Sequence, residues 1–107
     1  MRRKLYTAPE IVLCTFISKY GRDIIQEQTV CQLQERSESS IKMKVQNIAS
    51  MLNEEGIDFS NEVSVLTGLP EGKKGRRTNW EIVSKLVALG KEKHKALCFE
   101  ILNMDNQ

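Results

Sequence analysis

The sequence predicts an all-α fold, a small bundle of four to five helices within a single domain. Apolar residues recur at intervals of three and four along several segments, and helix-capping residues precede most of these segments. The strand signal is weak throughout, with residues 58–59 and 62–66 as its best candidates. A chain of 107 residues suffices for one core, and 40% hydrophobic with 28% charged residues is typical of a folded domain.

The first helix is predicted to follow Thr7 and to end near Tyr20. Thr7 and Glu10 match a capping box, in which each side chain accepts a hydrogen bond from the backbone N–H of the other residue. Gly21 suits the positive-φ position that follows a helix. The spacing gathers one group of apolar residues on a single face: Val12, Leu13, Phe16, Ile17 and Tyr20.

A second and a third helix are predicted over residues 23–34 and 38–53. The second has a weaker apolar pattern, and its adjacent Thr29 and Val30 have low helix propensity. Ser37 is a good cap for the third helix, which we expect to stop near Gly56. An apolar stripe runs along the third helix through Ile41, Val45, Ile48 and Leu52. The opposite face is polar and almost free of acids, with Ser39, Met43, Gln46 and Ser50 at its centre and Lys42 and Asn47 on its flanks.

The second half of the chain predicts two further helices after a long connection. Residues 57–77 lack a long periodic pattern. Thr78 and Glu81 repeat the capping-box spacing and predict a helix in which Trp80 anchors the core. Gly90 interrupts this pattern, and a last helix is predicted over residues 91–103. We expect the ends of the chain, residues 1–6 and 104–107, to be frayed.

Composition and motifs exclude several classes of function. No apolar run is long enough to span a membrane and no signal peptide is evident, so a cytoplasmic protein is expected, without a membrane partner. The cysteines are odd in number and lie in apolar helical patterns, which predicts buried, inert thiols rather than disulfides or metal ligands: Cys14, Cys31 and Cys98. His94 stands in a charged run and is predicted to lie on the surface. Without a catalytic constellation, a metal motif or a nucleotide motif, we expect a protein that is not an enzyme and has no cofactor.

The net charge of +2 conceals a segregation along the chain. Residues 1–22 carry five basic residues against one acid, and residues 67–98 carry eight against three. Between them, residues 23–66 carry eight acids against three basic residues. A basic loop contributes most to the second basic region, with Lys73, Lys74, Arg76 and Arg77. Such a loop attracts phosphate groups, although a solubilising surface loop has the same composition.

The second and third helices, with the turn between them, match a helix-turn-helix-like unit. In such a unit the second helix enters the major groove of duplex DNA. Its polar side chains can contact base edges and phosphates. The candidate residues here are Lys42, Lys44, Gln46 and Asn47, together with the basic loop. Two alternatives remain open, because an ordinary αα-corner has the same layout and Lys42 and Lys44 also suit a solvated helix surface. Glu38 at the entrance of the third helix would repel phosphate.

Residues 36–50 resemble a block in the helical N-terminal domains of bacterial HNH restriction endonucleases. The shared pattern is a capped R-[ST]-x-x-[AS]-[VI] entrance followed by x-M-K-[LV]-x-N, read here from Arg36 to Asn47. Two features that follow the block in those proteins are similar to the glycine-leucine pair at residues 68–69 and to the helix opened by Trp80. A helix that precedes the block is similar to residues 13–20. The resemblance covers roughly residues 8–90. It implies DNA recognition by the third helix, through Ser39, Lys42, Met43, Lys44, Gln46 and Asn47. The catalytic HNH domain is absent, so nuclease activity is not implied.

These observations lead to two functional hypotheses. The first is a non-catalytic DNA-binding module whose partner is double-stranded DNA. The alternative is a protein-binding adaptor or inhibitor, encoded by a phage or mobile element, that acts on a host nuclease. That hypothesis depends on carboxylates that imitate the spacing of phosphates. The acidic middle segment supplies them, with Asp23, Glu27, Glu35, Glu38, Glu54, Glu55, Asp58 and Glu62.

Overall fold

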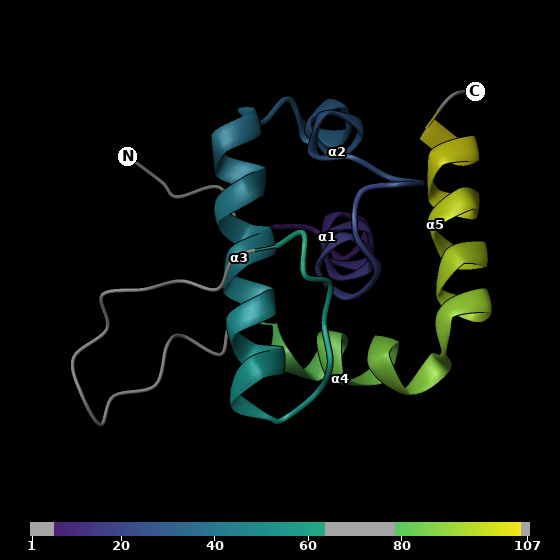
Figure 1. Ribbon diagram of the computed structural model, residues 1–107. Coiled ribbons are helices and arrows are strands. Elements are labelled where there is room, and N and C mark those ends of the chain that lie inside the picture. Colours follow the sequence, from purple (N-terminus) through teal and green to yellow (C-terminus); the bar gives the residue numbers. More distant parts are fainter. Residues whose placement is uncertain (1–5, 64–78, 106–107) are drawn as a thin grey trace.

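The computed structural model describes residues 6–63 and 79–105, and every regular element within these residues is a helix. No strand occurs in this part of the chain, including the described residues of the two strand candidates, so the prediction of an all-α bundle is confirmed. The helices, labelled in Figure 1, are α1 (Ala8–Tyr20), α2 (Glu27–Gln34), α3 (Glu38–Glu54), α4 (Trp80–Leu89) and α5 (Lys91–Asp105).

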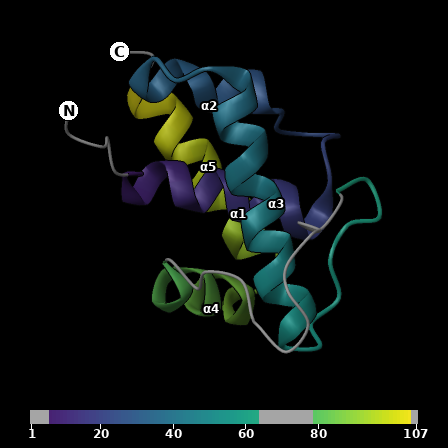
Figure 2. The ribbon, with the colours of Figure 1, turned by 90° about the vertical axis from the view of Figure 1, so that its left-hand side faces the viewer.

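Helix α1 is the centre of the bundle. Figure 1 views it along its axis, with α3 and α5 on either side, α2 above and α4 below. The view turned by 90° in Figure 2 shows α1 lying across α3. Helix α1 packs against each of the other four helices. The core therefore surrounds α1, and the remaining helices form a shell around it.

The predicted single apolar face of α1 is too narrow, because the helix is buried on nearly all sides. Two small polar residues make this possible by satisfying their hydroxyl groups on backbone carbonyls. The Thr15 hydroxyl donates to the Ile11 oxygen at 2.7 Å, and the Ser18 hydroxyl lies 3.0 Å from the Cys14 oxygen and 2.8 Å from the Val45 oxygen of α3. The buried residues of α1 are Glu10, Ile11, Leu13, Cys14, Thr15, Phe16, Ile17 and Ser18.

Both predicted ends of α1 are confirmed. The Thr7 hydroxyl accepts from the Glu10 N–H at 3.4 Å, and the Glu10 carboxylate accepts from the Thr7 N–H at 2.8 Å, which completes the capping box. Gly21 follows the helix at φ 92° and donates its N–H to the Ile17 oxygen at 2.8 Å. L side chains rarely adopt this positive φ, so the backbone angle favours glycine here.

Helix α2 begins four residues later than predicted, because residues 23–26 are not helical. The Gln26 side chain donates to the Arg22 oxygen at 2.7 Å, and Gln26 has extended backbone angles immediately before the helix. The Arg22 guanidinium binds Glu27 in the first turn. These contacts hold the segment away from helical geometry, and Ile24 is 40% exposed.

Helix α3 matches its predicted boundaries closely. The Ser37 hydroxyl accepts from the Ser40 N–H at 3.2 Å, as expected for the cap. Gly56, at φ 70°, follows the end of the helix. The predicted stripe is fully buried in the core: Ile41, Val45, Ile48 and Leu52. Ser50 was expected on the opposite face but is only 6% exposed, because α3 is buried over a wider arc in its second half.

Helix α4 begins at Trp80, directly after Asn79. Asn79 precedes the helix in left-handed geometry, with φ 69°, and makes no side-chain capping bond. Its carboxamide oxygen accepts from the Lys44 ammonium at 2.9 Å instead. The expected cap, Thr78, lies outside the described residues. Trp80 is partly buried and packs against the core, which confirms its predicted anchoring role. Gly90 separates α4 from α5 at φ 86°.

Two predictions about single side chains in the bundle are wrong. His94 is 1% exposed rather than on the surface, because its ring is enclosed between α5 and α1. Cys31 is partly exposed, whereas Cys14 and Cys98 are fully buried as expected, and all three thiols are free. Burial raises the pKa of Cys98 to about 12 and also raises the pKa of the Cys14 thiol.

No helix within residues 6–63 and 79–105 is long and apolar enough to cross a bilayer. The same residues contain no group of three or more His, Cys, Asp or Glu side chains placed to hold a metal ion.

Candidate nucleic-acid interface

The turn between α2 and α3 has a defined backbone geometry. Glu35 adopts the left-handed conformation, at φ 54° and ψ 45°, which ends α2. The Arg36 N–H donates to the Cys31 oxygen at 3.1 Å, and Ser37 then caps α3. Three residues therefore turn the chain so that α3 lies across the end of α2, as Figure 1 shows.

A buried ion pair ties this turn to the start of α1. The Arg36 guanidinium donates to both carboxylate oxygens of Glu10, with Nη2 3.0 Å from Oε1. The Arg36 side chain is 7% exposed and that of Glu10 is fully buried. Burial by itself raises the pKa of Glu10, but the hydrogen bonds from Arg36 and Thr7 outweigh it and hold this pKa below its ordinary value. The carboxylate of the α1 capping box thus also fixes the α2–α3 turn.

Tyr6 covers this ion pair and links it to α3. Its ring centroid lies 4.2 Å from the Arg36 guanidinium carbon, which is a cation–π contact. Its hydroxyl donates to the Ser40 carbonyl oxygen at 2.9 Å. Tyr6 was expected in the frayed start of the chain, but these contacts anchor it. Aromatic and charged side chains from three parts of the chain therefore hold the first turn of α3.

The structure brings part of the predicted DNA-contacting set to the surface of α3. Met43 is 58% exposed and the Lys42 side chain is 55% exposed. Ser39 is also exposed, whereas Gln46 and Asn47 are half-buried. Four of these exposed or half-buried side chains form what we call the outer face of α3: Ser39, Lys42, Met43 and Gln46.

Lys44 does not belong to this outer face and is a correction to the prediction. It is 5% exposed, and its ammonium donates to the side-chain oxygens of Asn47 at 3.3 Å and Asn79 at 2.9 Å. The ammonium also lies 5.3 Å from the Tyr6 ring centroid. Burial lowers the pKa of Lys44. Lys44 therefore joins α3 to the start of α4, and Asn47 takes part in the same contact.

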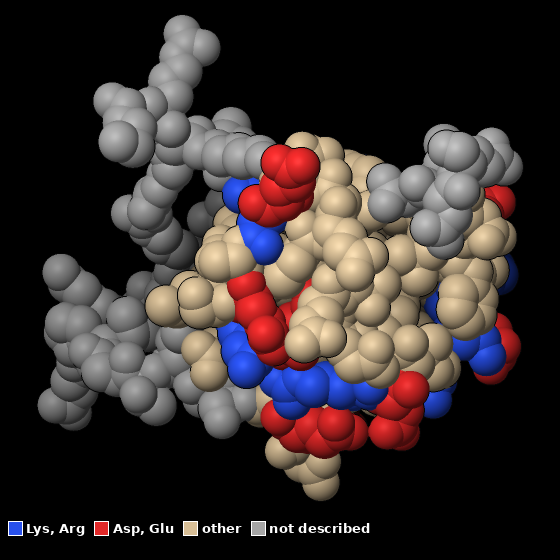
Figure 3. Space-filling model, turned by 90° about the horizontal axis from the view of Figure 1, so that it is seen from above, with Lys and Arg blue, Asp and Glu red and all other residues tan. Residues whose placement is uncertain are grey.

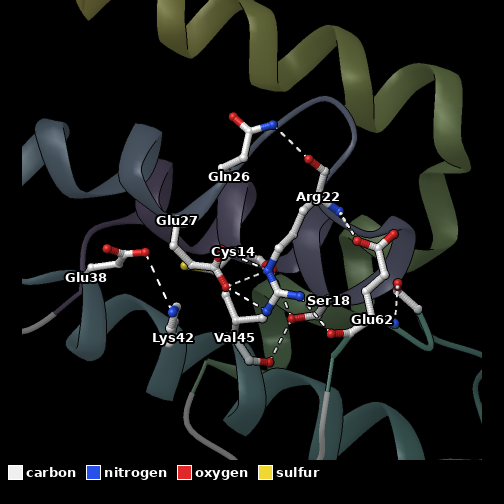
Figure 4. Close-up of polar contacts among 10 residues, drawn as sticks. Cys14, Ser18, Arg22, Gln26, Glu27, Glu38, Lys42, Val45 and Glu62 are labelled. Carbon is white, nitrogen blue, oxygen red and sulfur yellow. Dashed lines mark hydrogen bonds and ion pairs between the residues drawn. The ribbon is translucent and has the colours of Figure 1, made fainter.

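The exposed charge on the outer face is partly neutralised. The Lys42 ammonium lies 3.7 Å from a carboxylate oxygen of Glu38, one turn earlier on α3 (Figure 4). Both side chains are about half exposed, so water screens their attraction. Lys42 can exchange Glu38 for a phosphate at small cost, but Glu38 stays close to any bound anion.

Arg22, counted in the first basic region, is bound to acidic residues of the chain itself. Figure 4 shows its guanidinium between Glu27 and Glu62. Its Nε lies 2.9 Å from both carboxylate oxygens of Glu27, and its Nη1 donates to the Glu62 carbonyl oxygen at 2.7 Å. The Arg22 hydrogen bond lowers the pKa of Glu27 against the opposing effect of burial. Arg22 and Arg36 therefore stabilise the fold, and linear charge counts overstate the basic surface.

The charged surface around α2 is mixed in sign. Figure 3 views the molecule from above the end where α2 lies, and Lys and Arg side chains there alternate with Asp and Glu around a broad uncharged area. The predicted basic loop lies outside the described residues. The residues concerned are Lys73, Lys74, Arg76 and Arg77.

Comparisons of the chain with protein-family models, curated proteins and solved structures find no match. The resemblance of residues 36–50 to the HNH-associated block therefore remains a prediction from a short motif. The function must be argued from the geometry of α2, the turn and α3.

Proposed function

We propose that the chain is a non-catalytic DNA-binding module that places the outer face of α3 in the major groove of duplex DNA. One observation carries the proposal. A short, internally braced turn sets α3 across the end of α2, and the first half of α3 presents polar and apolar side chains to solvent. This is the layout through which helix-turn-helix proteins read base edges.

The chemistry of the outer face suits base contacts. The Gln46 carboxamide can pair with an adenine edge, and Met43 can pack on a thymine methyl group. Lys42 can contact a guanine or a phosphate, and Ser39 near the helix N-terminus can donate to a phosphate. The buried pair of Arg36 with Glu10 keeps this helix in one orientation, so little ordering is required on binding.

A titration of a labelled duplex with the protein at about 50 and about 200 mM salt tests the proposal. We expect binding that weakens with salt, because phosphate contacts release counterions. Lys42→Ala should weaken binding and lower the salt slope, whereas Lys93→Ala, on the exposed side of α5, is the matched control and should leave both unchanged. Absence of binding at low salt, or binding indifferent to salt, would contradict the proposal.

Glu38 offers a test with the opposite sign. Glu38→Gln keeps the size of the side chain but removes the charge that pairs with Lys42. Under this proposal it strengthens DNA binding, because Lys42 is released and a repulsive carboxylate is lost. A change in affinity of the same size for Glu35→Gln, whose side chain lies exposed in the turn, would show a general charge effect rather than a contact of α3.

A protein-binding inhibitor remains the second candidate, and exposed acidic residues favour it. Six acids of the middle segment are exposed, namely Asp23, Glu35, Glu38, Glu55, Asp58 and Glu62. Carboxylates displayed in this way can occupy a cationic DNA channel of a nuclease. Capture of a nuclease from a cell lysate that persists after digestion of nucleic acid would favour this candidate over DNA binding.

A further inference from the structure

His94 joins α5 to α1 through an unusual buried contact. It is the chain's single histidine and is 1% exposed. Its Nε2 lies 2.8 Å from the Val12 carbonyl oxygen, which requires Nε2 to carry a proton. Its Nδ1 is buried and has no hydrogen-bond partner within the described residues. The neutral ring therefore satisfies one nitrogen and leaves the other facing apolar surroundings.

The groups around this ring do not favour a positive charge. The ring meets Phe16 edge-on, with centroids 5.2 Å apart, and lies 6.1 Å from the Tyr20 centroid. Two ammonium groups flank Tyr20: Lys19 of α1 at 5.4 Å and Lys91 of α5 at 5.6 Å from its centroid.

The acidic residues nearest to His94 in the chain do not offset a positive charge on its ring. On α5, Glu92 is 84% exposed and lies 3.6 Å from Lys95. The charged residues of α4, Glu81 and Lys85, are exposed. No carboxylate contacts the imidazole in the described part of the chain.

Protonation of His94 would place a second N–H, with a full charge, in this enclosure. Such a group requires either an acceptor or water, and α1 offers neither to Nδ1 among the described residues. Burial accordingly lowers the pKa of His94, against a smaller opposing effect of the Val12 hydrogen bond. A free histidine has a pKa of about 6.5, so the released helix binds a proton more readily than the docked one.

The connection at Gly90 allows α5 to move as a unit. Gly90 links α4 to α5 at φ 86°, and a β-carbon at this position would meet nothing within 4 Å. An unpacked glycine with positive φ between two helices is a suitable hinge. We propose that His94 makes the docking of α5 on α1 dependent on pH, so that acidification weakens this docking and uncovers the aromatic side of α1 more often.

Hydrogen exchange, analysed by segment and corrected for intrinsic rates, tests this proposal between about pH 7.5 and about pH 5.5. We expect protection of α5 and of the α1 residues beneath it to fall several-fold at the lower pH, while α3 keeps its protection. His94→Gln should abolish this difference, because its side-chain amide can still donate to Val12 but does not titrate. Lys93→Gln, an exposed neighbour, is the control and should behave like the wild type.

Two outcomes would overturn the proposal. One is an equal loss of protection in all helices, and the other is the same pH response in His94→Gln as in the wild type. If His94→Gln does not fold, the NMR titration of the single histidine in the wild type decides. A midpoint below about 6.5 that coincides with the loss of α5 protection supports the proposal, and a midpoint at or above it overturns the proposal.

Discussion

Arg36→Ala should destabilise the protein far more than the loss of any exposed charge. The Arg36 side chain is 7% exposed and Glu10 is fully buried, so the substitution leaves a carboxylate in the interior without its cation. Removal of one partner of a buried pair typically costs about 3–5 kcal/mol. Tyr6 also loses its cation–π contact. Against a total stability of about 5–15 kcal/mol for a domain of this kind, such a loss brings the protein close to unfolding.

Urea denaturation followed by circular dichroism measures this effect. With a urea dependence of about 1–3 kcal/mol per molar, the expected loss shifts the midpoint by at least about 1 M. Lys42→Ala is the control, because it removes an exposed pair with Glu38 whose contribution is about 0.3–0.5 kcal/mol. A further variant, Glu10→Gln with Arg36→Met, should recover part of the loss, since neither charge then remains buried.

The stabilisation that the Arg36–Glu10 pair provides should decrease as the pH falls. The folded protein holds the pKa of Glu10 below its ordinary value, so the unfolded chain takes up a proton first as the pH falls. The contribution of the Arg36 pair is therefore complete above about pH 5 and decreases as the pH falls through the value of the unfolded chain and then that of the folded one. A cost of Arg36→Ala below about 1 kcal/mol at pH 7, equal to that of the Lys42 control, would refute this account of the turn.

Three further substitutions or reactions test the packing of the bundle. Gly21→Ala should destabilise by more than about 1 kcal/mol in thermal unfolding, because φ is 92° and alanine is strained at this angle; a neutral effect would contradict this. Ser18→Ala should cost about 1 kcal/mol through loss of the contact with Val45. A loss no larger than that of Ser84→Ala, whose hydrogen bond to Glu81 is exposed, would argue against it. With a thiol reagent, Cys31 should react before the two buried cysteines, and equal rates in the folded protein would contradict the burial described above.

Local signals in the sequence predict much of the fold. The capping box of Thr7 and Glu10, the cap at Ser37 and the stops at Gly21 and Gly56 depend on residues close in the chain, and the structure confirms them. Each of these signals works through a backbone group within one helical turn of the side chain. A reading of the sequence therefore locates these helix ends well.

Contacts between distant residues account for two of the predictions that failed. His94 is enclosed through Val12, which is 82 residues away, and Lys44 is buried through Asn79, which is 35 residues away. His94 stands in a charged run and Lys44 on a polar stretch of its helix. Both settings indicate exposure when only residues close in the chain are considered. No local pattern reveals that α1 is surrounded on nearly all sides or that Lys44 meets the start of α4.

The candidate interface was predicted in part. Periodicity places Ser39, Lys42 and Met43 on the exposed side of α3, and the structure agrees. It does not predict that Arg36, which opens the motif of residues 36–50, is directed inward to Glu10. That inward contact explains how a short turn can hold α3 in a fixed orientation.

Site-specific photo-cross-linking tests the central claim most directly. A photoreactive amino acid is introduced in place of Met43 on the outer face of α3, and in a second protein in place of Phe99, which is 44% exposed on α5. Irradiation with a labelled duplex at low salt should cross-link the first protein to DNA and leave the second unlinked. Equal cross-linking from both positions, or cross-linking from the Phe99 position alone, would contradict the claim that α3 is the helix that enters the groove.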